Sequence, residues 1–499
     1  MKEAGATSRL SSMRGLNVQP RSVVATEGTE LGLARTDGGG RLAILAPKDS
    51  SLLTSFEAET ADLHDGGTLL LAPPTARNMA ALREALPSLR PRPLGLATSA
   101  GFGDRLGLAT PGHVRAVRTV GDEIAPIFAQ QSIREMQRTG RTPQEVLDDA
   151  TWGVFAEGWR KGVGADADHL KTFEDVDACV EAGYTFFTFD PGDHVDDRAE
   201  GMDAAALRAA LEELPWEKLE DRFEDLRKRY PERVDVEGHG VGLGEDALAR
   251  AAVKYGRAVA RVAEMYRHLG EAMGERAYEV EVSVDETESP TTHAQHAYIA
   301  GELSRLGVRF VSLAPRYVGR FEKGVDYVGS VDGFERDFAV HAAIARHFGP
   351  YKLSLHSGSD KFSIYPPAMR QTRGLIHLKT AGTSYLEALR TTAALDPDLF
   401  REVYALALSR YGEDRASYHV SARPERAILP NEVSDAELPG LLDRFDEREI
   451  LHVTFGSILK EQSLKDRLFS MLRASPQEYS ANLETHFTMH LKPFVRGGH

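Results

Sequence analysis

The stretch ADADHLKTFEDVDACVEAGYTFFTFD, residues 165–190, contains one complete pattern of strand, helix and strand. Residues 165–172 and 185–190 are short candidate strands, and DVDACVEAGY between them has apolar residues at helical spacing before a glycine stop. Parallel strands need a crossover connection that is usually a helix, whereas antiparallel strands can be joined by a tight turn. The stretch therefore predicts two parallel strands and their crossover helix.

The same alternation runs through the middle of the chain. Segments such as TTHAQHAYIAGELSRLG and RDFAVHAAIARHFG have the helical period and stop at a glycine. Eight candidate strands occur in series, at 94–100, 125–131, 165–172, 185–190, 278–284, 309–315, 352–358 and 374–380. Eight such units predict an α/β fold, a closed (β/α)8 TIM barrel over residues 91–395, whose active site lies at the carboxyl ends of the strands.

Four segments outside these units complete the predicted organisation. Residues 1–40 end in TDGGGRL and predict a loosely packed, flexible lead-in, and residues 41–90 predict a small α/β cap. Residues 191–277, after the fourth strand, contain two predicted long charged helices, which indicate a lid, a contact in a homo-oligomer or a solvated helical decoration. Residues 396–499 predict an α-rich extension that packs on the barrel.

Composition excludes several classes of function. The 499 residues carry a formal net charge of −15, which disfavours nucleic acid as a partner because affinity for phosphates comes largely from Lys and Arg. No apolar run approaches the roughly 18 residues that span a bilayer, so we expect no membrane partner. The N-terminus lacks an apolar signal region, and Cys179 is the single cysteine. We therefore expect a cytoplasmic enzyme with a small-molecule substrate.

A repeated tetrapeptide brings chemistry to two of the predicted strands. HLKT occurs at 169–172 and again at 377–380, each time at the end of a candidate strand. Because side chains alternate between the faces of a strand, we expect His169 with Lys171, and His377 with Lys379, on the inward or rim face of the barrel.

Two further strands add acids and another histidine. Alternation in YEVEVSVDETES places Glu279, Glu281, Ser283 and Asp285 on one face, and carboxylates along the inside of a buried strand need a metal or a proton as partner. His356 ends the seventh strand, before a small loop that leads to Lys361. His194 and Asp190 are weaker candidates, because acidic residues near Pro and Gly are commonly in turns.

Histidines from separate strands, with acids nearby and no thiolate cluster, indicate one catalytic divalent cation with an open coordination position. Zn, Mn, Ni, Co and Fe all accept such ligands, and the sequence leaves the choice open. In this setting a cation acts as a Lewis acid on a carbonyl or enediolate oxygen.

A series of long motifs resembles the tagaturonate epimerase family. GFGDRLGLATPGH, DADHLKT, TFFTFDPGDH, EVSVDETESPTT, SLHSGSDKFSIYPP and HLKTAGTSYLEALR occur in the family's order, and the likeness covers about residues 90–460. The resemblance implies a metal-dependent isomerase that interconverts D-tagaturonate and D-fructuronate at C4, in the catabolism of hexuronates.

A more distant resemblance to class II aldolases implies roles for individual residues. The Asp–His pair and the LHSGS strand end are similar to the aldolase motifs, which makes His169 and His356 metal ligands. Asp168 and Glu281 would then be the proton-transfer pair. The third metal histidine of the aldolases has no counterpart near the sixth strand, and we expect His377 to replace it.

The C4 hydrogen is not α to the C2 carbonyl, so simple deprotonation is a poor route to epimerisation. Retro-aldol cleavage of the C3–C4 bond, rotation of the aldehyde and re-addition avoid this difficulty, with general acid/base catalysis on both sides. Because the chain is acidic overall, binding of the substrate carboxylate requires positively charged side chains close to it. We expect Lys361 to bind the carboxylate, with Arg316, Lys171 and Lys379 as further cations.

Two alternatives remain open at this point. A class II aldolase that releases its fragments would use much the same residues. A non-catalytic, sugar-binding accessory barrel would keep the fold without needing Asp168, Glu281 and two metal histidines, because fold by itself does not establish activity.

Overall fold

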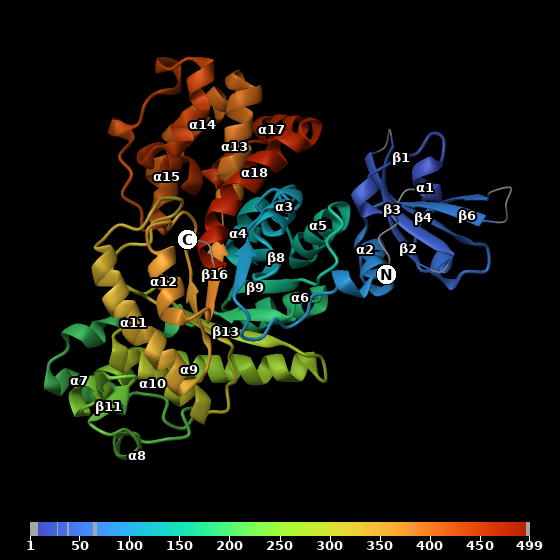
Figure 1. Ribbon diagram of the computed structural model, residues 1–499. Coiled ribbons are helices and arrows are strands. Elements are labelled where there is room, and N and C mark those ends of the chain that lie inside the picture. The colour runs from blue at the N-terminus through green and yellow to red at the C-terminus, as the bar shows by residue number, and fades with distance from the viewer. Residues whose placement is uncertain (1–7, 27, 37–38, 63–66, 381, 496–499) are drawn as a thin grey trace.

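A computed structural model describes residues 8–495 except 27, 37–38, 63–66 and 381. Its centre is a closed barrel in which all eight neighbouring strand pairs are parallel (Figure 1). The strands are β7 (Ser99–Phe102), β8 (Ala125–Ser132), β9 (Gly164–Leu170), β10 (Phe186–Phe189), β13 (Glu279–Val284), β14 (Ser312–Pro315), β15 (Lys352–Leu355) and β16 (Ile376–Thr380). The predicted TIM barrel is confirmed, and the first and sixth strands begin five and three residues later than expected.

Helices surround the barrel, and several of the crossover segments have clear start and stop residues. The Thr172 hydroxyl accepts the backbone N–H of Asp175 at the start of α6, and Gly183 ends that helix at φ +100°. Thr142 and Thr292 form equivalent capping boxes. The barrel helices are α3 (Thr110–Val120), α4 (Ile133–Thr139), α5 (Pro143–Ala156), α6 (Phe173–Ala182), α9 (Glu245–Met273), α10 (His293–Arg305), α11 (Val331–Phe348), α12 (Tyr365–Thr372) and α13 (Thr383–Leu395).

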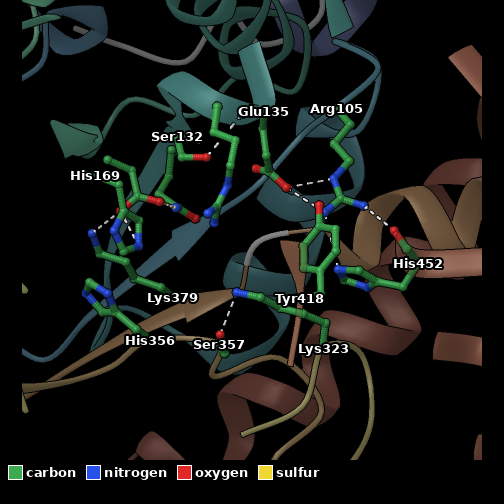
Figure 2. A pocket seen from close by; sticks show the side chains of 13 residues that line it. Arg105, Ser132, Glu135, His169, Lys323, His356, Ser357, Lys379, Tyr418 and His452 are labelled. Atoms are coloured by element: carbon green, nitrogen blue, oxygen red, sulfur yellow. Dashed lines mark hydrogen bonds and ion pairs between the residues drawn. The ribbon is translucent and has the colours of Figure 1, made fainter. Parts of the chain in front are cut away.

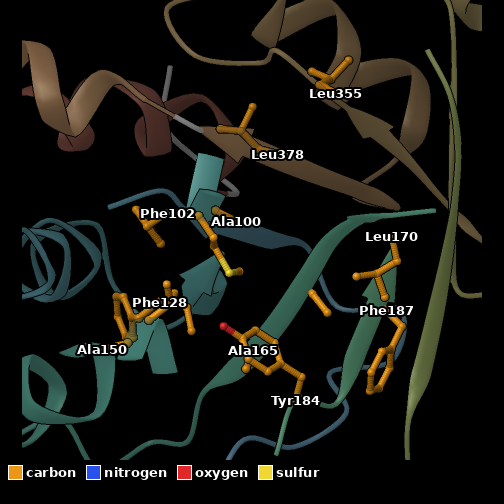
Figure 3. Packing of buried hydrophobic residues seen from close by; sticks show 14 of the residues in the cluster. Ala100, Phe102, Phe128, Ala150, Ala165, Leu170, Tyr184, Phe187, Leu355 and Leu378 are labelled. Atoms are coloured by element: carbon orange, nitrogen blue, oxygen red, sulfur yellow. The ribbon is translucent and has the colours of Figure 1, made fainter. Parts of the chain in front are cut away.

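Apolar side chains of the barrel strands pack with the surrounding helices, whereas charged side chains lie inside the barrel. Strand residues such as Phe187 and Leu378 belong to a large buried apolar cluster that includes helix residues such as Ala150 (Figure 3). Asp166 and Glu281, which alternate with apolar neighbours, are fully buried among other charged side chains. Because buried charges are costly unless paired, this interior is built for charge pairing and chemistry.

The N-terminal region is a folded sheet, and the predicted flexible lead-in over 1–40 is wrong for its described part. β3 (Thr29–Thr36) pairs antiparallel with β4 (Gly39–Pro47), so TDGGGRL spans a hairpin turn, of which residues 37–38 lie outside the described residues. Leu31 and Leu33 of β3 pack into the main apolar cluster and Ala34 into a second, smaller one, so residues on both faces of this strand are buried. The other elements are α1 (Arg9–Ser12), β1 (Asn17–Val18), β2 (Val24–Thr26), β5 (Glu59–Asp62), β6 (Gly67–Ala72) and α2 (Ala76–Ala85).

Residues 191–277 form only one of the two long helices that were predicted. The helix α7 (Ala204–Glu212) ends shortly before Pro215, which cannot donate a helical hydrogen bond, and α8 (Phe223–Arg229) is separate. The short turns η4 (Gly192–His194) and η5 (Asp197–Gly201) precede α7. A hairpin of β11 (Arg233–Val236) and β12 (His239–Gly242) follows α8. The long helix α9 packs against α6 and α10, so it is the fourth barrel helix rather than an addition.

The C-terminal helices pack on the barrel, above it in Figure 1. The helix α18 (Pro476–Leu491) contacts α3 and α13, and α14 (Pro397–Asp414), α15 (Phe445–Val453), α16 (Phe455–Lys460) and α17 (Gln462–Ala474) complete the layer. Short 3₁₀ turns are η1 (Pro20–Ser22), η2 (Ser51–Thr54), η3 (Pro87–Leu89), η6 (Arg415–Ser417), η7 (Pro424–Arg426), η8 (Pro430–Glu432), η9 (Asp435–Asp443) and η10 (Lys492–Phe494). Among the described helices, none has the length and apolarity needed to cross a membrane.

Two buried histidines on α18 predict an acid-sensitive contact between this layer and the barrel. Burial lowers the pKa of His486 to about 4 and that of His490 to about 3, whereas the unfolded chain takes up these protons near pH 6.5. The stability they give is therefore complete above pH 6.5 and is lost as the pH falls toward 4, at up to about 1.4 kcal/mol per pH unit for each ring. We expect the melting temperature to fall less steeply between pH 6.5 and 5 in His490→Gln than in the wild type. Equal slopes in calorimetry would contradict this assignment.

Candidate active site

One ammonium group and three carboxylates form the centre of the barrel. The Nζ atom of Lys379 lies 2.7 Å from Asp166, 2.6 Å from Asp168 and 2.8 Å from Glu281. Burial raises the pKa of Asp166 to about 7, while at Asp168 the Lys379 charge outweighs the effect of burial and lowers the pKa. The three carboxylates raise the pKa of Lys379 against its own burial. Asp168 is therefore ionised and held in place, with its second oxygen accepting a hydrogen bond from Gln130.

The end of β9 brings both members of the Asp168–His169 pair toward the site. His169 has a positive φ of 52°, and the pairing of β9 with β10 shifts register here, so the strict alternation of faces stops. Lys171 lies at the rim beside His169, because its Nζ atom is 3.8 Å from the same Asp190 oxygen that Nδ1 of His169 contacts at 3.2 Å. Lys171 has a side chain that is 39% exposed and pairs with Asp193 on the next loop at 2.9 Å.

Three side chains from the ends of β9, β13 and β15 can hold one metal ion. One ligand atom from each of His169, Asp285 and His356 lies within 4.8 Å of the others. The Nδ1 atom of His356 is 3.1 Å from Asp285, and the two imidazole rings are 5.1 Å apart between centroids. Two imidazoles and a carboxylate are a common ligand set for catalytic divalent ions, with positions left for substrate.

Carboxylates outside this trio orient its imidazoles. Glu281 lies 2.6 Å from Nε2 of His356, and Asp190 lies 3.2 Å from Nδ1 of His169. Burial disfavours protonated rings, but nearby carboxylates, chiefly Asp168 for His169 and Asp285 for His356, raise the pKa values to about 10 and about 9. The same negative surroundings favour a divalent cation, which competes with protons for the rings.

His377 does not join the trio. Its ring lies deeper in the barrel, where Nδ1 is 2.9 Å from the Ser99 hydroxyl and Lys352 donates to that same hydroxyl. Burial lowers the pKa of His377 to about 3, so the ring is neutral. Strand alternation predicted the correct inward face for His377, but it does not predict depth along the barrel axis. Asp285, which the same argument placed only on a strand face, takes the third position of the trio.

Lys361 is also displaced from its expected role. Its ammonium group is fully buried and donates to the backbone carbonyls of Glu322, Val325 and Ser359 at 2.5–2.9 Å. It therefore stabilises the loops beside the site, and Lys361 lines neither of the hollows described next. Lys379, expected to bind the substrate carboxylate, is already surrounded by three carboxylates of the protein.

Two adjoining hollows open on the trio, and Figure 2 shows the first of them. His356, Ser357, Lys323, Arg134 and Tyr418 line both of them. The first is also lined by Arg105, Gln130, Ser132, Glu135, Asp168, His169, Lys379 and His452. The second has a volume of about 250 Å³ and is also lined by Asp285, Glu286, Pro315, Arg316, Tyr317, Gly319, Arg320, Phe321, Glu322 and His419. Tyr418, His419 and His452 come from the C-terminal extension, so this layer helps to form the site.

Most cations of the hollows already have a carboxylate partner. Arg105 pairs with Glu135, Arg134 with Glu286 and Arg320 with Glu322. Within the described part of the chain, Arg316 and Lys323 form no ion pair: Lys323 donates to the Ser357 hydroxyl at 2.6 Å, and Nε of Arg316 has no hydrogen-bond partner. Arg316 was predicted from the sequence. Lys323 was missed, because its loop shows no motif and only folding brings it to His356.

Comparison with known proteins identifies the family. The model of the tagaturonate epimerase family matches residues 20–494. The tagaturonate/fructuronate epimerase of Thermotoga maritima is 42% identical over 485 residues, which cover 96% of this chain and 97% of that protein. The native crystal structure of fructuronate-tagaturonate epimerase from Cohnella laeviribosi is 37% identical with a TM-score of 0.90, and a complex with one glycerol is 36% identical with a TM-score of 0.89. Both comparisons cover 97% of this chain and 98% of the solved one. The chain therefore belongs to the tagaturonate epimerase family and is an epimerase of the isomerase class.

Proposed function

We propose that this epimerase interconverts D-tagaturonate and D-fructuronate at C4, as a step in hexuronate catabolism. The observation that supports this most directly is the arrangement of His169, Asp285 and His356 beside two cations that lack carboxylate partners. The site thus offers separate places for the polar ketose end and for the carboxylate end of a small sugar acid. The printed activities of the two relatives above agree with this choice of substrates.

Arg316 and Lys323 bind the substrate carboxylate in this proposal. Both line the larger hollow, and an ion pair with substrate would satisfy charges that the protein itself leaves unpaired. The volume of this hollow, about 250 Å³, is close to the lower end of typical ligand pockets. This volume suits a six-carbon acid. Lys361, by contrast, has its donors occupied by backbone carbonyls.

The trio would hold one divalent cation. Its donor set fits this role, because two imidazoles and a carboxylate converge from three strand ends and Glu281 orients one of the rings. A bound cation supplies Lewis-acid stabilisation of negative charge on the substrate oxygens. Zn, Mn, Ni, Co and Fe remain equal candidates, since all accept such ligands.

Asp168 performs the proton transfer that starts the reaction. Its carboxylate lines the first hollow, is ionised, and accepts the proton of the substrate C4 hydroxyl. The C4–O bond becomes a carbonyl while the C3–C4 bond breaks, and its electron pair passes into an enediolate over C2 and C3. Rotation of the C4 aldehyde and re-formation of the C3–C4 bond on its other face complete the epimerisation, with a proton returned to the C4 oxygen.

On the other side of His356, the ionised Glu286 is suited to accept the C4 hydroxyl proton of the opposite epimer in the reverse direction. In the forward direction the C4 oxygen takes its proton from solvent, to which Asp168 releases the proton that it accepted. His356 lines both hollows, whereas Asp168 lines only the first and Glu286 only the second. The charges of His169, Lys323 and Arg134 outweigh the effect of burial and hold the pKa of Glu286 at about 2. Glu281, the second proton-transfer residue expected from the sequence, is fully buried behind His356 and lines neither hollow. We therefore assign Glu281 to positioning that ring.

The experiment that tests the function follows D-fructuronate deuterated at C4 by NMR, with metal-reconstituted full-length protein. We expect D-tagaturonate with the deuterium fully retained, because C4 keeps its hydrogen when the C3–C4 bond breaks. Loss of the label to solvent would instead show proton abstraction at C4. Accumulation of two three-carbon products would establish the rival class II aldolase, and absence of any conversion would favour the non-catalytic barrel.

The carboxylate role of Lys323 predicts a selective defect. Lys323→Met removes a charge that pairs with uronates, and we expect KM for D-fructuronate to rise by about 10- to 100-fold, as befits a charge-assisted hydrogen bond. For the uncharged ketoses fructose and tagatose, KM should change little. Arg320→Met is the matched control, because Arg320 lines the same hollow but already pairs with Glu322. Equal losses for charged and uncharged substrates would rule out this role.

A further inference from the structure

A second group of possible metal ligands lies outside the barrel, between α10 and α11 (Figure 1). The Nε2 atom of His293 is 3.0 Å from one oxygen of Asp337, and Nε2 of His341 is 3.5 Å from the other. One ligand atom from each of these three residues lies within 4.8 Å of the others. We propose that His293, Asp337 and His341 bind a second divalent transition-metal ion such as Zn²⁺, with water in the remaining position. This site lies apart from the hollows, which none of its three residues lines.

A chain of buried hydrogen bonds prepares His341 as a ligand. Its Nδ1 lies 2.8 Å from Nδ1 of His296, whose Nε2 lies 2.9 Å from the Tyr351 hydroxyl. When His341 donates through Nδ1, His296 donates through Nε2 to Tyr351, and Nε2 of His341 keeps its lone pair. Ligand histidines are commonly fixed in this way, by a hydrogen bond from the nitrogen that does not bind the metal.

In that tautomer, Nε2 of His341 is free to bind a cation. It is buried and makes no hydrogen bond with any residue in the described ranges, although it points toward the Asp337 carboxylate. A lone pair that faces a carboxylate is unfavourable, and an ion placed between them removes this repulsion. Asp337 forms ion pairs only with His293 and His341 among the described residues, so no Lys or Arg already takes the place of a metal.

A third group, Asp360 with His486 and His490, shows the contrasting case. There Arg448 lies 3.1 Å from Asp360, and Nε2 of His490 accepts the backbone N–H of Asp360. The protein's own donors thus occupy that group. In the proposed site the side chains of His293 and Asp337 are 33% and 23% exposed, which leaves a route for a metal ion and a water molecule.

The proposed ion would brace the wall of the active site. It links the helices that follow β13 and β14, the strands whose ends carry Asp285 and Arg316. The His341 ring also packs edge-on against Tyr317, with 5.6 Å between centroids, and Tyr317 lines the larger hollow. Such a site acts on stability, since an ion that binds only the folded protein raises its melting temperature.

The test compares zinc binding by full-length wild type, His293→Gln, Asp337→Asn and His356→Ala. After equilibration with Zn²⁺ and removal of excess, we expect His293→Gln and Asp337→Asn each to hold about one equivalent less than the wild type. His356→Ala should retain this equivalent, which distinguishes the outer site from the inner one. Zn²⁺ should also raise the melting temperature of His356→Ala more than that of His356→Ala combined with His293→Gln. His293 is partly exposed, so its replacement should fold. Equal zinc content in the wild type, His293→Gln and Asp337→Asn would overturn the proposal.

Discussion

Asp168→Asn should lower kcat by about 10²- to 10⁴-fold, the range typical of a lost general acid/base. The amide cannot accept the proton of the C4 hydroxyl, yet it has nearly the same shape and can still contact Gln130. Lys379 keeps Asp166 and Glu281 as partners, and the metal trio is unaltered. We therefore expect metal content and folding to persist while turnover is lost, measured by steady-state kinetics and metal analysis on the same preparation.

The matched control for this substitution is Asp193→Asn. It makes the same carboxylate-to-amide change on the neighbouring loop, where Asp193 is exposed and pairs with Lys171. We expect near-normal kcat from the control. An Asp168→Asn enzyme with a comparable rate would remove Asp168 from the proton-transfer step, while the barrel and the trio would stand.

Removal of a trio residue should have a comparably large effect through a different cause. His356→Ala and Asp285→Asn each delete a proposed ligand, and we expect metal affinity to fall by more than the 10- to 100-fold typical of residues that only orient ligands. Turnover should fall with it under limiting metal and should recover partly when metal is raised. Affinity can be measured by competition with a chelating dye, and recovery by metal titration of activity.

His377→Asn provides the discriminating comparison. The sequence alone predicted His377 as the third ligand, whereas its ring lies at Ser99 and Lys352 in the structure. We expect His377→Asn to keep its metal affinity and Asp285→Asn to lose it. The reverse pattern would restore His377 as a ligand and would exclude Asp285. Glu281→Gln should show the smaller loss that is expected when His356 is misoriented but still present.

The barrel could be predicted from the sequence because its pattern is local. Several units carry their own strand period, capping residue and glycine stop, as Thr172 and Gly183 show for α6. The predictions failed where one sequence pattern is compatible with two different structures. TDGGGRL indicates a turn in either a loose segment or a hairpin, and the charged stretch before Pro215 has helical composition without a continuous helix.

The site was only partly predictable for a physical reason. Alternation along a strand fixes which face a side chain takes, so Glu281 and His377 were expected to face the barrel interior, where both are fully buried. Asp168 was expected only from the resemblance to aldolases, and His356 from its place at a strand end. Alternation does not fix depth along the barrel axis, which separates His377 from His356. It also fails where the backbone leaves the strand conformation, as at His169, where the consecutive residues Asp168 and His169 both line the first hollow.

The sequence by itself determined the parallel barrel, the family and the inward-facing acids and histidines, because these depend on short-range periodicity and on motifs. Only the tertiary structure decided which groups meet. Asp285 lies with His169 and His356 because three strand ends converge, and Lys323 and Tyr418 reach the same hollow from loops far apart in the chain. Such contacts depend on how strands, loops and the C-terminal layer pack in space, and separation along the sequence carries no record of that packing.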